Sequence, residues 1–157
     1  MNTLVVYFSR TGSTRKIAQA IADQLGCPIE EITEPKGRKG SIGFMRSGYQ
    51  AYRQKSSKIN PVAAKMKDFD MVIVGTPLWA GRLSSPVRAF LIQHGKDIKK
   101  AAFFCTKASS EPERVFEAMQ SLVGKAPVAT LDLKTEEVAK QEYDEKLNDF
   151  LGKVRNA

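Results

Sequence analysis

The chain has 157 residues, 42% of them hydrophobic and 27% charged, which is typical of one folded domain with a buried core. It contains no apolar run long enough to cross a membrane and no secretory signal pattern, so we expect a cytoplasmic protein without a membrane span. The formal net charge of +8 favours an anionic partner: nucleic acid, an acidic membrane surface or an acidic protein.

Short apolar runs alternate with helical patterns along the chain. Each run is too short for a helix and most are rich in β-branched or aromatic residues, so we expect strands at 3–8, 27–32, 70–76, 101–106 and 127–133. Strands that alternate with helices predict an α/β fold: a three-layer, doubly wound sheet of five parallel strands in a single domain, 1–157.

Helix start and stop signals separate these strands. The first helix follows a polar turn and ends at Gly26. Ser85 is expected to cap a second helix, with Pro86 in its first turn. Ser110 and Glu113 have the spacing of a capping box that begins a third helix, which ends near Gly124. The pattern of 135–154 predicts one final helix.

Residues 33–60 interrupt the alternation between the second and third strands. Ile42, Met45, Tyr49 and Tyr52 have roughly helical spacing there. The simplest interpretation is an inserted helix whose apolar stripe packs on the domain. A lid or docking surface beside a functional site is the alternative.

Cysteine and histidine content limits the chemistry. Cys27 and Cys105 are far apart in sequence and neither belongs to a CxxC motif, so we expect free thiols. His94 is the only histidine, and it lies near a predicted helix end. We therefore predict no metal site and assign no catalytic residue.

Small hydrogen-bonding residues crowd the turn between the first strand and the first helix. Because amides at a helix start lack internal partners and carry partial positive charge, they favour an anion. The turn reads as a phosphate cradle, made of Ser9, Arg10, Thr11, Gly12, Ser13 and Thr14. A helix cap alone would need only one such residue, so the crowding of hydroxyl residues favours a binding role. The glycine patterns of dinucleotide and nucleoside triphosphate sites are absent, so the turn suits a bound phosphate monoester.

The stretch VVYFSRTGSTRKIAQAI, residues 5–21, resembles the FMN-binding signature of the flavodoxin family. The matching positions are Val5, Val6, Tyr7, Ser9, Gly12, Thr14, Ala18 and Ile21. The resemblance extends over nearly the whole chain. It implies the strand order 2-1-3-4-5 and noncovalent FMN, with the phosphate on residues 9–14.

The resemblance also implies two further loops around the ring. Gly75, Pro77 and Gly81 are expected to set an open turn after the third strand, where Trp79 would cover the ring; a tryptophan folded onto the core is the alternative. The implied contacts are Thr76, Pro77, Leu78, Trp79, Ala80 and Gly81, then Thr106, Lys107, Ala108 and Ser109.

Lys107 departs from the family pattern, in which glycines or an aromatic are common. We hypothesise that its ammonium lies near the N1/C2=O edge of the flavin and stabilises the anionic reduced form. A solvated loop lysine is the alternative.

Charge bears on the choice between functions. The expected function is electron transfer with a redox partner protein, and the first alternative is an NAD(P)H-dependent quinone-type reductase. Basic residues favour an acidic or anionic partner; they are Lys36, Arg38, Lys39, Arg46, Arg53, Lys55 and Lys58. Arg82 could contact such an anion, although a plain surface charge is the simpler interpretation.

A nucleic-acid-binding protein that has lost the cofactor is the second alternative. Phe44, Tyr49 and Tyr52 lie among the basic residues, as in sites that stack bases. Their helical spacing favours packing over stacking, and no recognised nucleic-acid motif is present.

Overall fold

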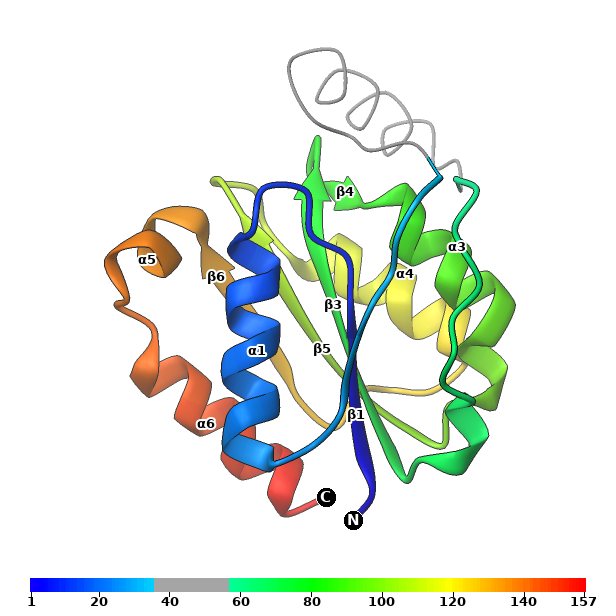
Figure 1. The fold of residues 1–157 in the computed structure, drawn as a ribbon. Helices are drawn as coiled ribbons and strands as arrows, with labels where there is room; N and C mark the ends of the chain where they lie inside the picture. The colour runs from blue at the N-terminus through cyan, green and yellow to red at the C-terminus, as the bar shows by residue number, and fades with distance from the viewer. Residues whose placement is uncertain (36–56) are drawn as a thin grey trace.

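A twisted sheet of parallel strands runs through the centre of the molecule, between two layers of helices (Figure 1). The computed structural model describes residues 1–35 and 57–157. Their elements are β1 Thr3–Tyr7, α1 Ser13–Leu25, β2 Ile29–Glu31, η1 Met66–Asp68, β3 Met71–Trp79, β4 Arg82–Leu83, α3 Ser85–His94, η2 Gly95–Asp97, β5 Lys100–Lys107, α4 Glu113–Val123, β6 Thr130–Lys134, α5 Thr135–Lys140 and α6 Asp144–Arg155.

The strand order confirms the predicted topology. The parallel strands run β2-β1-β3-β5-β6, and β4 is a short antiparallel strand paired with β3 outside this path. Numbered among the parallel strands alone, this is the order 2-1-3-4-5. β1 pairs with β3 along its whole length, from Thr3 opposite Met71 to Tyr7 opposite Gly75.

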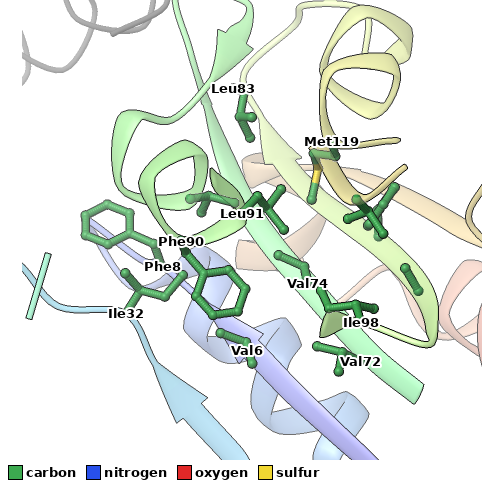
Figure 2. Packing of buried hydrophobic residues seen from close by; sticks show 14 of the residues in the cluster. Val6, Phe8, Ile32, Val72, Val74, Leu83, Phe90, Leu91, Ile98 and Met119 are labelled. Atoms are coloured by element: carbon green, nitrogen blue, oxygen red, sulfur yellow. The ribbon is translucent and has the colours of Figure 1, made fainter. Parts of the chain in front are cut away.

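Each face of the sheet has its own core, because alternate residues of a strand point to opposite faces. Val72 and Val74 face helices α3 and α4, drawn green and yellow in Figure 1, and pack with Phe90 and Met119 in the cluster that Figure 2 shows. Ile73 and its neighbours on the other face pack against α1 and α6. The near-continuous apolar sequence of β3 follows from this burial on both faces.

The starts of α3 and α4 differ from the predicted caps. Ser84, rather than Ser85, is the N-cap residue of α3, and Pro86 lies in the first turn as expected. The capping box from Ser110 to Glu113 is wrong. Pro112 occupies the N-cap position, and its carbonyl accepts the amide protons of Val115 and Phe116, so α4 begins at Glu113.

The single final helix predicted for 135–154 is also wrong. Gln141 has the left-handed φ of 58° and donates its N–H to the carbonyls of Glu137 and Val138, which closes α5. The chain then restarts as α6 at Asp144. Val138 and the apolar face of α6 are still buried in one cluster, so the apolar pattern was correct although the helix is broken.

The ends of the insertion at 33–60 lie side by side. Asn60 donates its backbone N–H to the carbonyl of Thr33 at 2.8 Å and its side-chain amide to the Thr33 hydroxyl at 2.9 Å. The predicted helix with Ile42, Met45, Tyr49 and Tyr52, and the basic residues from Lys36 to Lys55, lie outside the described residues. In the part of the chain that is described, no helix is both long and apolar enough to span a bilayer.

Candidate functional site

A cavity of about 310 Å³ opens at the carboxyl edge of the sheet, where β1, β3 and β5 end. Ligands of open α/β sheets bind at this edge. The residues that line it come from three segments that sequence analysis had assigned to one site, together with the start of α5: Ser9, Arg10, Thr11, Ser13, Thr14, Pro77, Leu78, Trp79, Thr106, Lys107, Ala108 and Thr135.

The turn between β1 and α1 has the geometry of an anion cradle. Gly12 is the N-cap residue with a φ of 111°, a conformation that side chains disfavour, and its N–H donates to the Ser9 hydroxyl at 3.1 Å. Among the described residues no side chain caps α1. The amides of its first turn therefore remain available for a bound anion.

A pair of buried hydroxyls joins this turn to the end of β5. The Oγ1 atoms of Thr14 and Thr106 lie 2.8 Å apart, although the residues are 92 positions apart in sequence. Both side chains are buried. The pair fixes the distance between the turn and β5 across the floor of the cavity.

The expected open loop at 75–86 is a β-hairpin instead. β3 continues through Trp79, and Ala80 and Gly81 form the turn with positive φ values of 50° and 69° before β4. Gly75 is not a turn residue: it lies inside β3, where a Cβ would collide with the ring of Phe104.

Trp79 packs on the core, which is the alternative that the sequence left open, and does not stand in an exposed loop. Only 5% of the residue is exposed, and its ring meets Phe8 edge-on with centroids 5.4 Å apart. One edge of the residue still lines the cavity. The reason is tertiary: Phe8 and the neighbouring apolar side chains offer the indole more buried contact than the loop does.

Three other predicted contacts of the hairpin lie away from the cavity wall. Thr76 is buried, and its Oγ1 lies 2.8 Å from the Ser84 hydroxyl, which ties β3 to the start of α3. Ala80 and Gly81 line a neighbouring hollow that also touches Ser110 and Glu113. Gly12 and Ser109 are likewise not among the residues that line the cavity.

Lys107 is not a solvated loop lysine. It ends β5 with 8% of its side chain exposed, and its Nζ lies 2.8 Å from Oδ2 of Asp132 on β6. Burial disfavours the charged ammonium, but the hydrogen bond and the attraction from Asp132 outweigh it, so the pKa of Lys107 is raised. A paired cation therefore lines the cavity.

The other reactive side chains do not contribute to it. Cys105 is a free, buried thiol whose pKa is raised by burial and, to a lesser extent, by Asp132. Cys27 is also free, and burial raises its pKa. Neither thiol is activated as a nucleophile. His94 is at the end of α3, where its ring packs on Phe90.

Thr135 is the lining residue that sequence analysis missed. It is the first residue of α5 and follows β6 directly. The signal was present in the sequence, because a hydroxyl residue after a fifth parallel strand arrives at the same edge of the sheet.

The fold and this cavity define a flavodoxin-like protein. Flavodoxin 1 from Bacillus cereus has the same fold, with a TM-score of 0.60 at 18% identity over 100% of this chain and 99% of its own. A flavoprotein from Lactobacillus acidophilus, solved in complex with FMN, has a TM-score of 0.72 at 20% identity over 90% of this chain and 98% of its own.

Residues 1–101 match the sequence profile of the NADPH-dependent FMN reductase family, and the chain belongs to this family. FMN is accordingly its cofactor. The chain is also 28% identical over 97 residues to an NAD(P)H dehydrogenase (quinone) from Archaeoglobus fulgidus, which covers 59% of this chain and 51% of that protein. The matches span about half the length of the curated relatives. They give no support to the nucleic-acid interpretation.

Proposed function

We propose that the chain is an FMN-dependent oxidoreductase that takes a hydride from NAD(P)H and passes electrons to a quinone-type acceptor. The observation that carries the proposal is the cavity at the carboxyl edge, which combines an uncapped helix start with an apolar wall. Family membership and the name of the Archaeoglobus relative support the choice of a reductase.

The residues present fit FMN. Its phosphate is dianionic near neutral pH, and the first turn of α1 presents amides together with the hydroxyls of Ser9, Thr11, Ser13 and Thr14. The ring needs a flat apolar surface with a few polar groups. Pro77, Leu78 and Trp79 supply the first, and Thr106 to Ala108 supply the second.

Bound FMN supplies hydride acceptance and electron release, so the protein needs no acid–base residue of its own for this chemistry. The chain's own residues bind the FMN and orient it. Leu78 and Trp79 exclude water from one side of the cavity, because their apolar atoms form its wall. The Thr14–Thr106 pair holds the cradle against β5. Lys107 keeps a positive charge at the cavity, because its raised pKa leaves the ammonium protonated.

The direct test is a visible spectrum of the purified, FMN-loaded protein during anaerobic addition of NADH or NADPH. Rapid bleaching of the flavin band supports a reductase. An oxidised band that persists with both nucleotides, yet bleaches with dithionite, contradicts the proposal and favours the electron carrier. Free FMN under the same conditions is the control for uncatalysed reduction.

A further inference from the structure

A second cavity, of about 260 Å³, is lined by β4, by the first turn of α3 and by α4 along most of its length. We name it the arginine cavity after three of the residues that line it: Arg82, Leu83, Arg88, Arg114, Ala118, Ser121 and Leu122. Among the described residues, this lining carries three positive charges and no negative one.

Arg88 carries a buried polar atom that no described residue satisfies. Its side chain is half-buried, and its Nε–H is buried without a hydrogen-bond partner in the part of the chain that is described. Burial, and then the positive charge of Arg82, lower the pKa of Arg88. Such a group costs free energy unless an acceptor receives its hydrogen bond, and an anionic oxygen would also balance its charge.

The chain offers Arg88 and Arg114 no carboxylate partner. Neither forms an ion pair with another described residue. Residues 36–56 contain no Asp or Glu, so they cannot supply a carboxylate either. Glu111 and Glu113 line an adjacent hollow that Arg82 and Arg114 also line, whereas Arg88 does not line it. An anion bound in the arginine cavity would supply the hydrogen-bond acceptor that Arg88 lacks.

The position of the cavity suits one part of a ligand that also reaches the flavin site. Leu78 and Trp79 line the flavin cavity, and the β4 residues opposite them, Leu83 and Arg82, line the arginine cavity. Paired strands lie about 5 Å apart. The two cavities are therefore lined by paired strands of one hairpin, and an extended dinucleotide is long enough to cross two strands.

We propose that the arginine cavity binds the 2′-phosphate of NADPH while the nicotinamide lies at the flavin cavity. This inference rests on the proposed reductase function and adds the residues that would recognise NADPH, the nucleotide in the family's description. A phosphate monoester carries close to two negative charges and can accept paired hydrogen bonds from a guanidinium. NADH lacks this group, so it would leave Arg88 without a partner.

The test compares reduction of the bound FMN by NADPH and by NADH in wild type, Arg88→Gln and Arg114→Gln. We expect kcat/KM for NADPH to fall roughly 10- to 100-fold in Arg88→Gln, and less in the exposed Arg114→Gln, with little change for NADH. Arg155→Gln at the end of α6 removes the same charge far from the hairpin and should keep the wild-type ratio. Equal losses for both nucleotides, or none, would overturn the inference while leaving the reductase function intact.

A binding experiment separates this inference from the proposed function. Calorimetry on the FMN-loaded protein compares adenosine 2′,5′-bisphosphate, adenosine 5′-monophosphate and inorganic phosphate, without requiring any electron transfer. The inference expects the bisphosphate to bind at least about tenfold more tightly than the monophosphate, and Arg88→Gln to abolish the difference. Equal affinities, or inorganic phosphate that binds as tightly as the bisphosphate, would overturn it. Arg88→Lys, which keeps the charge but not the planar fork, should retain part of the difference.

Discussion

Residues 9–14 and 76–83 both lie at the carboxyl edge of the sheet, where central parallel strands end, yet they differ in what determines their structure. The first segment leaves the sheet at once as an open turn, set by Gly12 and by the Ser9 hydroxyl that accepts its amide proton. The second continues as strand and hairpin because Trp79 packs on Phe8. Local chemistry shapes the cradle, whereas tertiary packing shapes the wall opposite it.

The strongest test of this contrast is Trp79→Ala in the apoprotein. If the indole belongs to the core, its loss should lower the free energy of unfolding by about 3–5 kcal/mol, because a large buried side chain is replaced by a cavity. Urea unfolding without FMN measures this. Trp79→Phe should cost less than half as much. A change within about 0.5 kcal/mol would mean that Trp79 only covers the cofactor, as an exposed residue would.

The contrast also explains which parts of the site the sequence could predict. The open turn at 9–14 was predictable, because glycine and hydroxyl side chains act on backbone groups only a few positions away; its role in binding stays a prediction. The hairpin was not, because Gly75 looks like a turn signal in sequence, whereas its role is to leave room for the ring of Phe104 on the neighbouring strand. The strand order was predictable, because the alternation of apolar runs and helices is a property of the whole chain.

Lys107 marks a similar limit for electrostatics. The sequence places a lysine at the end of the fourth parallel strand but does not reveal that Asp132, 25 positions later, is its neighbour on β6. The register of β5 and β6 makes Asp132 a neighbour of Lys107, and no local sequence pattern encodes this register. The hypothesis of a lone positive charge at the flavin therefore becomes a hypothesis about a charge pair.

Thr14→Ala tests the cradle side of the comparison. It removes a hydroxyl from the cavity and leaves Thr106 without its partner, so FMN should bind roughly 10- to 100-fold more weakly. Titration of FMN into the apoprotein by calorimetry measures the affinity. Thr130→Ala, on an exposed position of β6, makes the same chemical change outside the cavity and should leave the affinity unaltered. An unchanged FMN affinity in Thr14→Ala would mean that the cradle is not part of the FMN site.

The charge pair predicts two shifts of opposite sign in the flavin midpoint potential. Lys107→Gln leaves Asp132 negative beside the cavity and should make the potential more negative, whereas Asp132→Asn leaves Lys107 positive and should make it less negative. We expect about 30 mV in each direction, which for a two-electron couple corresponds to ~1.4 kcal/mol. Redox titration of both variants checks this. Equal potentials in all three proteins would show that the pair does not act on the flavin.

The smallest effect concerns the start of α5, where Thr135 reaches the cavity and where local chemistry should again decide. The Glu137 carboxylate accepts a hydrogen bond from the Lys134 backbone N–H at 2.8 Å and forms an ion pair with Lys146 at 2.8 Å. The hydrogen bond from Lys146, and then that from the Lys134 amide, lower the pKa of Glu137. A lowered pKa means that the stabilisation is present above the unfolded-state value of about 4.3 and is lost as the pH falls through the folded value.

Glu137→Ala should therefore cost about 1 kcal/mol of unfolding free energy near neutral pH and progressively less in acid. Glu136→Ala, an exposed carboxylate on the same helix, is the matched control and should cost under about 0.5 kcal/mol. A cost for Glu137→Ala that does not change with pH would mean that packing, rather than the charged cap, positions the start of α5, so that this segment would resemble the hairpin and not the cradle.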